Sequence, residues 1–202
     1  MARRPTHDHR AVSSPVRTRH RDGFWMIAPL AERDGDSGFA AWLRRATLLA
    51  LVYAVAGWLG LRLAVPPGYA TVIWPASGFA LAGLLLLGRN LWPGVLIGSF
   101  IVNTVIGHVF DGPAINWIAL LNAVVIACGS TAQALLATQL VRHRFGDPIA
   151  IRGVVDLARL AALTGPLVCV VAATVGVASL SLTGVMPSHA RVANWLTWWI
   201  GD

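Results

Sequence analysis

Long apolar runs with very few charged residues fill the chain from residue 46 to its end. Only 12% of the residues are charged, which is about half the share found in a soluble domain. More than half of these charges lie in the first 45 residues. A helix that crosses a hydrocarbon core about 30 Å thick needs about 20 apolar residues. The sequence therefore predicts an all-α fold, a polytopic bundle of transmembrane helices.

The apolar runs predict five complete membrane spans and the start of a sixth. The second run has sixteen residues, or roughly 24 Å of helix, so it spans only if residues 69–72 also lie at membrane depth. The sixth begins near Val192, and the eleven residues to Asp202 are too few to cross a bilayer. We therefore expect this chain to be the front part of a longer protein. The five expected spans are Ala46–Val65, Ile73–Gly88, Leu91–Gly107, Ala114–Val141 and Val154–Leu182.

The uncharged segment Pro66–Gly78 interrupts the helical pattern between the first two runs. It contains three prolines and two glycines. Proline removes a backbone hydrogen-bond donor and clashes with the preceding turn, so the segment cannot be one continuous helix. Irregular backbone at membrane depth is stable only where protein or a cavity shields it. We therefore expect a packed element of a membrane domain that faces a ligand site.

The distribution of arginine predicts the orientation of the chain. Residues 1–41 are Arg-rich and lack a lasting periodicity, which predicts a disordered cytoplasmic tail ahead of a membrane domain at 42–202. Because cytoplasmic connections carry an excess of basic residues, Pro66–Gly78 is expected to face the periplasm. The formal net charge of +7 collects in the tail and at helix ends, so no nucleic-acid partner is expected. The arginines that mark the second and fourth connections as cytoplasmic are Arg89, Arg142, Arg144 and Arg152.

Small and polar residues predict how the spans pack. Gly94 and Gly98 have GxxxG spacing, which places both on one helix face and lets a neighbouring helix approach closely. Asn122 and Gln133 are eleven residues apart, which is about three helical turns, so both lie on one face of the fourth span. We expect these two side chains mainly to form hydrogen bonds between helices. Pro166 predicts a kink in the fifth span.

Four motifs occur in order along the chain: Tyr53–Leu61, Pro66–Gly78, Trp92–Asn103 and Trp198–Asp202. Together they closely resemble the type-1 membrane-associated sensor (MASE) domain, and the resemblance covers about residue 46 to the end. It implies the amino-terminal sensory input module of a bacterial signalling protein. Together with the arginine distribution, this leads us to expect a multi-pass protein of the inner membrane with a cytoplasmic N-terminus. In that family a histidine kinase, diguanylate cyclase or cyclic-di-GMP phosphodiesterase region usually follows.

Candidate ligand-binding residues gather around the broken segment. Tyr69, Thr71 and Ser77 supply hydroxyl groups there. A helix that starts near Pro75 presents free N–H groups that suit an anion or a carbonyl ligand, although Ser77 equally fits a local backbone partner. The family pattern places Asp202 in the closing helix, and an acid within a spanning segment is a functional candidate. The full candidate set is Tyr69, Thr71, Trp74, Ser77, Asn103 and Asp202, of which Asn103 also fits a helix cap and Trp74 an interfacial anchor.

The chain contains no phosphate loop, nucleophile elbow, metal-binding helix, kinase signature or cyclase signature. We therefore expect no enzyme activity, metal or cofactor in it. The expected function is sensory input, with the lipid bilayer and an unidentified small-molecule signal or membrane protein as partners, and a homodimer formed through an output region. Two alternatives stay open. One is the capture subunit of a small-molecule transporter, and the other is a membrane scaffold whose polar groups only stabilise packing.

Overall fold

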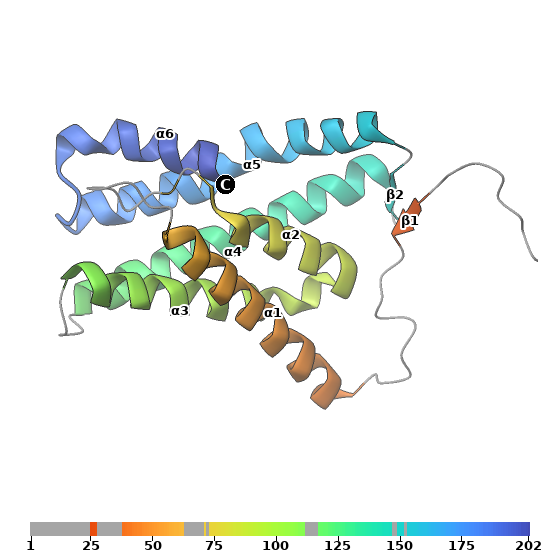
Figure 1. The fold of residues 1–202 in the computed structure, drawn as a ribbon, viewed down its shortest axis with the longest axis horizontal. Helices are drawn as coiled ribbons and strands as arrows, with labels where there is room; N and C mark the ends of the chain where they lie inside the picture. Colours follow the sequence, from red (N-terminus) through yellow and green to blue (C-terminus); the bar gives the residue numbers. More distant parts are fainter. Residues whose placement is uncertain are drawn as a thin grey trace, which may run out of the picture.

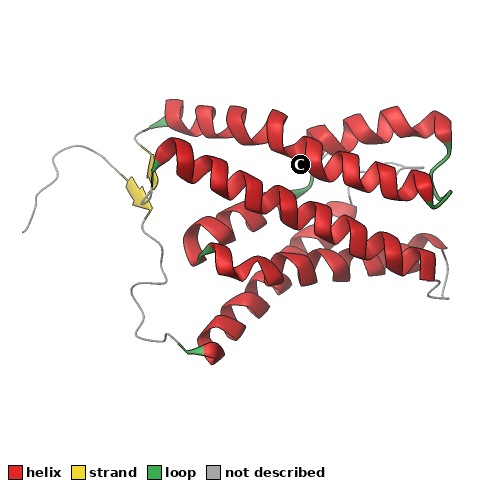
Figure 2. Cartoon of the chain, turned by 180° about the vertical axis from the view of Figure 1, so that it is seen from behind, coloured by secondary structure: helices red, strands yellow, loops and turns green. Residues whose placement is uncertain are grey.

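The computed structural model describes residues 25–27, 38–62, 71, 73–111, 117–146, 149–151 and 153–202. Within these ranges six α-helices form a bundle (Figure 1), and helix makes up nearly all of the regular structure (Figure 2). The predicted all-α fold is therefore confirmed. Two short 3₁₀ turns, η2 (Arg89–Leu91) and η3 (Ser188–Ala190), lead into the third and sixth helices. The helices are α1 (Phe39–Leu61), α2 (Pro75–Leu87), α3 (Trp92–Asp111), α4 (Trp117–Phe145), α5 (Val154–Leu182) and α6 (Arg191–Gly201).

Two strands of three residues each form a small antiparallel ladder beside the bundle. β1 (Trp25–Ile27) pairs with β2 (Ile149–Ile151), and Trp25 lies opposite Ile151. β1 falls within residues 1–41, the segment for which the sequence predicts a disordered tail. Most of the remaining tail lies outside the described residues.

Within the described residues, three helices are long and apolar enough to cross a membrane: α1, α4 and α5. The predicted count of five complete spans is therefore not confirmed. α2 has only 13 residues, or about 20 Å of helix. Pro75 marks the start of α2, because proline fits the first turn of a helix, where its missing N–H costs nothing. Gly88 marks the end, because its φ of 113° is a conformation that favours glycine.

The helices are arranged around the centre of the bundle. α3, α4 and α5 lie side by side in alternating directions, and α1 crosses α3 (Figure 1). α6 packs along α5 and ends near the middle of the bundle. α2 begins at this same place, packs against α1 and α4, and runs away from α6. The start of one short helix and the end of another therefore meet at the centre of the bundle.

The GxxxG pair of α3 packs directly against α1, as the sequence predicts. A Cβ atom built on Gly94 would lie 2.5 Å from the carbonyl oxygen of Ala46, and one on Gly98 would lie 2.7 Å from that of Ala50. Both separations are too short for any side chain without backbone movement. Glycine at these two positions thus sets the distance between α1 and α3.

Asn122 joins α4 to α5 near the end of the bundle where α5 finishes. Ser179 donates a hydrogen bond to Asn122 Oδ1 (2.5 Å), and Asn122 Nδ2 donates one to Thr183 Oγ1 (3.0 Å). Asn122 and Ser179 are both buried. The predicted role of Asn122 as a hydrogen-bonding group between helices is therefore confirmed.

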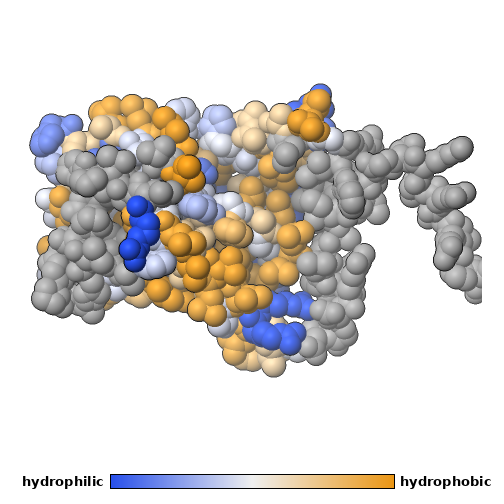
Figure 3. Space-filling view, in the orientation of Figure 1, coloured by the Kyte–Doolittle hydropathy of each residue, from blue (hydrophilic) through white to orange (hydrophobic). Residues whose placement is uncertain are grey.

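Large apolar side chains cover much of the outer surface of the helices (Figure 3). On α1 alone, Leu48, Leu51 and Val55 are each more than half exposed. Soluble monomers rarely expose apolar patches of more than a few hundred Å². This surface suits contact with lipid chains, which agrees with the apolar composition of the three long helices.

Candidate functional site

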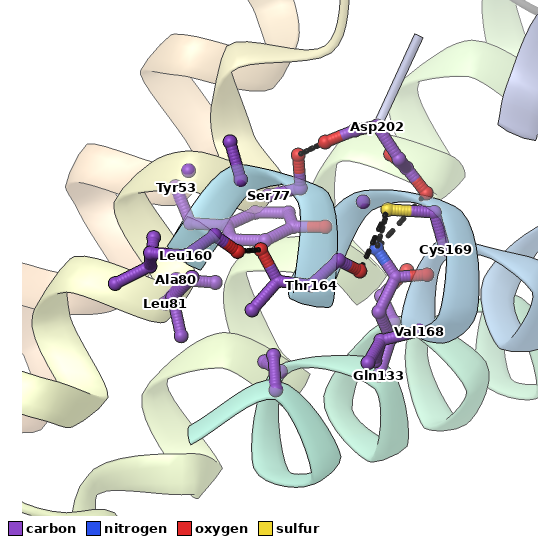
Figure 4. Close-up of a pocket in the computed structure, with 16 residues that line it drawn as sticks. Tyr53, Ser77, Ala80, Leu81, Gln133, Leu160, Thr164, Val168, Cys169 and Asp202 are labelled. Carbon is purple, nitrogen blue, oxygen red and sulfur yellow. Dashed lines mark hydrogen bonds between the residues drawn. The ribbon is translucent and has the colours of Figure 1, made fainter. Parts of the chain in front are cut away.

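A cavity of about 290 Å³ lies at the centre of the bundle, between α1, α2, α4, α5 and the end of α6. We call it the central cavity. Part of its lining is apolar and includes Ala80, Leu81 and Val168. Its polar lining residues come from all five helices, and those drawn in Figure 4 surround one region of the cavity. They are Tyr53, Ser77, Ser130, Gln133, Thr164, Cys169 and Asp202.

Hydrogen bonds connect the start of α2 to the end of α6 beside this cavity. The backbone N–H of Trp74 donates to the carbonyl oxygen of Gly201 (2.7 Å). Ser77 Oγ lies 2.8 Å from the carbonyl oxygen of Trp74 and 2.9 Å from the main-chain oxygen of Asp202. These four residues, Trp74, Ser77, Gly201 and Asp202, form what we call the α2–α6 junction. The first N–H groups of a helix have no partner within that helix, and here α6 supplies a partner for one N–H at the helix start.

Gln133 links three helices through its side-chain amide. From α4, its Nε2 donates to Asp202 Oδ2 (3.1 Å), and its Oε1 accepts a hydrogen bond from the backbone N–H of Ala172 in α5 (3.1 Å). Gln133 is buried. A carboxylate accepts and an N–H donates, so the two partners together fix which way the amide points. The Gln133 side chain thus holds α5 and the end of α6 in a defined relation to α4.

The α5 backbone carries a proline beside the cavity. Pro166 lies within the helix and cannot donate a backbone hydrogen bond. Its carbonyl oxygen accepts a hydrogen bond from Trp199 Nε1 of α6 (3.1 Å). Thr164 donates its hydroxyl proton to the carbonyl oxygen of Leu160 (2.8 Å). The Trp199 bond therefore attaches α6 to α5 at Pro166, whereas the Thr164 bond lies within α5.

Tyr53 closes the cavity on the side of α1. Its side chain is only 1% exposed. Its hydroxyl group lies near the side chains of Ser99 in α3, Trp74 ahead of α2 and Ser130 in α4. Tyr53 therefore connects the α1–α3 pair to the elements that line the other side of the cavity.

Among the described residues that line the central cavity, Asp202 is the one that carries a charge. This described part of the lining contains no arginine and no histidine. A carboxylate held away from water without a positive partner is expensive. Its only side-chain hydrogen bond within the described residues comes from the neutral amide of Gln133. An acid in such a place is a functional candidate rather than a contribution to stability.

The structure brings together two of the predicted site residues, Ser77 and Asp202, in the lining of the cavity. Trp74 belongs to the α2–α6 junction, and its ring packs against Gly57 and Gly60 of α1. Trp74, Thr71 and Asn103 are absent from the lining of the central cavity.

Two of the predicted site residues, Thr71 and Asn103, form hydrogen bonds with nearby backbone groups and do not line the cavity. Thr71 is buried and donates its hydroxyl proton to the carbonyl oxygen of Ile73 (3.0 Å). Asn103 donates from Nδ2 to the carbonyl oxygen of Ser99 in its own helix (2.8 Å). This contact fits the alternative in which Asn103 has a local polar role better than it fits ligand binding. Tyr69 lies outside the described residues.

Sequence reasoning did not propose Tyr53, Gln133 or Cys169 as site residues. Gln133 was expected to connect helices, which it does, and the same amide lines the cavity. Tyr53 stands in a family motif without any polar neighbour in sequence, so no local pattern marks it. Tyr53, Gln133 and Cys169 lie far apart in the sequence, so the sequence does not show that they meet in space.

The MASE1 family model matches residues 45–202, which includes the central cavity, the α2–α6 junction and most of α1. No curated protein sequence and no solved structure matches the chain. The match extends over more than three quarters of the sequence. The chain therefore belongs to the MASE1 family, the membrane-associated sensor domains that form the sensory input of signalling proteins.

Proposed function

We propose that this chain detects a small-molecule signal in its central cavity and passes the change to an output region of a bacterial inner-membrane protein. The observation that carries this proposal is the convergence of polar groups from five helices on a cavity of about 290 Å³. Ligand pockets are mostly apolar concavities with a small number of placed polar groups, and the central cavity has that composition.

The α2–α6 junction supplies a route by which occupancy changes helix positions. Asp202 takes part in the junction through its main chain and faces Gln133 through its side chain. A ligand that competes for the Asp202 carboxylate changes how the end of α6 is held against α4 and α2. Such a ligand shifts the balance between two helix arrangements only if it binds one of them more tightly.

The proposed topology has five spans, with a cytoplasmic N-terminus. Exposed arginines support it: Arg44 lies near the start of α1, Arg89 between α2 and α3, and Arg144 near the end of α4. These three places lie toward the same end of the bundle (Figure 1). Since cytoplasmic connections are enriched in basic residues, this end faces the cytoplasm in our proposal.

The proposal also includes the parts of the protein that act on the signal. A histidine kinase, diguanylate cyclase or cyclic-di-GMP phosphodiesterase region would read the helix positions, and a homodimer would form through that region. Family membership favours this role over the transporter and scaffold alternatives.

Filling the cavity tests the proposal. Gly78 and Gly165 both line the cavity, and a Cβ atom built on either meets nothing within 4 Å. Gly78→Leu and Gly165→Leu should each abolish the response of the output in the full-length protein. Gly38 at the start of α1 is equally open and lies outside the cavity lining, so Gly38→Leu is the matched control. A full response in both filled variants, at normal membrane levels, would refute the proposal.

A further inference from the structure

We infer that the ligand of the central cavity is a small organic cation, a protonated amine attached to an apolar body. This inference rests on the proposed function, because it names the chemistry of the signal that the cavity takes. It follows from the charge of the lining, from the hydrogen-bonding state of the polar groups and from the size and apolar lining of the cavity.

The charge of the lining favours a cation. Asp202 contributes a carboxylate, and none of the described residues that line the cavity has a basic side chain to balance it. Within the described residues, Gln133 hydrogen-bonds Oδ2, and no hydrogen bond reaches the second carboxylate oxygen, Oδ1. A positive ligand would supply both the missing charge and the missing donor, whereas an anionic ligand would face the carboxylate without any compensating group.

Two hydroxyl groups of the cavity lining, those of Ser77 and Thr164, already donate their protons to main-chain oxygens. Thr164 already donates its proton to the Leu160 carbonyl oxygen. Ser77 lies within hydrogen-bonding distance of two main-chain oxygens, so its single proton is also engaged. The lone pairs of both oxygens stay available. An ammonium group has three donors and no acceptor, which suits a lining that contains a carboxylate and hydroxyl oxygens with free lone pairs.

The remaining lining limits the size and polarity of the rest of the ligand. Ala80, Leu81, Leu160 and Val168 make part of the cavity lining apolar. Its volume of about 290 Å³ is about twice that of an apolar cavity of ~150 Å³ that binds benzene. A ligand body of about a dozen non-hydrogen atoms, aliphatic or aromatic, therefore suits the space.

Binding of three probes of matched shape tests the inference. The probes are 2-phenylethylammonium, neutral 2-phenylethanol and anionic phenylacetate, each measured by saturable binding to the full-length protein in lipid nanodiscs. We expect the ammonium probe to bind most tightly and phenylacetate to show no saturable binding. Asp202→Asn should weaken the ammonium probe at least tenfold and leave 2-phenylethanol within about twofold. Asp202→Glu, which keeps the charge, should retain a preference for the ammonium probe.

A control variant separates the role of this carboxylate from net charge. Asp156 at the start of α5 pairs with Arg159 (3.4 Å) and lies outside the cavity lining. Asp156→Asn removes the same charge and should leave binding of the ammonium probe unchanged. Unspecific partitioning of the amine into lipid does not saturate and does not depend on Asp202.

Three outcomes overturn the inference: phenylacetate binds as well as the ammonium probe, Asp202→Asn leaves ammonium binding unchanged in a folded protein, or no probe binds saturably. The signalling response of the Gly78→Leu and Gly165→Leu variants distinguishes a failure of the cation inference from a failure of the proposed function. If the filled cavity abolishes the response and no amine binds, the cavity is a signal site for a ligand of another class. If the filled variants keep the response and no amine binds, both proposals fail.

Discussion

The Gln133 side chain in α4 donates a hydrogen bond to the Asp202 carboxylate at the end of α6 (3.1 Å) and accepts one from the α5 backbone at Ala172 (3.1 Å). One amide thus holds two neighbouring helices to α4 beside the central cavity. This arrangement leads to predictions about stability, packing, orientation and signalling.

Gln133→Leu should destabilise the folded bundle by about 1–3 kcal/mol, because it removes the hydrogen bonds of a buried amide to the Asp202 carboxylate and to the Ala172 N–H. Reversible unfolding in mixed detergent micelles measures this change. Gln139 lies on the exposed side of the same helix, so Gln139→Leu serves as the control and should change the unfolding free energy by less than about 0.5 kcal/mol. Equal stability of the two variants would show that the Gln133 amide does not hold the helices together.

Gly94→Ala should weaken the packing of α1 on α3, because the added methyl group would lie 2.5 Å from the Ala46 carbonyl oxygen. Overpacking of this kind typically costs about 1–3 kcal/mol. Gly165→Ala is the matched change, since its Cβ atom would meet nothing within 4 Å. The same unfolding assay compares them. A Gly94→Ala protein as stable as the Gly165→Ala protein would contradict the close approach of the two helices.

The hydrogen bond from Ser179 to Asn122 should show a measurable coupling in a double-mutant cycle. Pairwise hydrogen bonds between membrane helices average about 0.6 kcal/mol and reach about 1.7 kcal/mol. The buried position of both side chains and the short separation (2.5 Å) place this pair toward the upper part of that range. Asn122→Ala, Ser179→Ala and the double variant supply the cycle, and a coupling near zero would argue against the bond.

Many features of the fold were predictable from the sequence, because they depend on local patterns. Apolar runs gave the positions of the helices to within a few residues at most ends, and Gly94 with Gly98 marked the face that packs on α1. The prediction of five complete spans went beyond what the described helices show, since α2 ends after 13 residues. Both its short length and its start at Pro75 were visible in the sequence.

The site was only partly predictable, for a physical reason. Ser77 and Asp202 were proposed from broken backbone and from an acid in an apolar helix, and they do meet in the cavity lining. Tyr53, Gln133 and Thr164 come from three other helices. Their convergence depends on how whole helices pack, which no spacing within one segment reveals. Asn103 looked like a site residue because it is polar, yet its contact is with its own helix.

The orientation of the bundle can be checked with single cysteines. In a protein with Cys128 and Cys169 replaced by serine, Asn90→Cys lies beside α3 in the connection assigned to the cytoplasm, and Ser188→Cys lies ahead of α6 at the periplasmic side; both positions are exposed. A membrane-impermeant thiol reagent should label residue 188 in spheroplasts and residue 90 only after lysis. The reverse pattern would contradict the topology.

The most direct test of the central claim is the signalling output of the full-length protein with Asp202→Asn, compared with the wild type and with Asp156→Asn. The output is kinase activity or the cellular level of cyclic-di-GMP, according to the region that follows, under conditions in which the wild type responds. Membrane levels of all three proteins are measured in parallel. Our account predicts that Asp202→Asn loses the response while Asp156→Asn keeps it. A wild-type response from a folded Asp202→Asn protein would contradict the account.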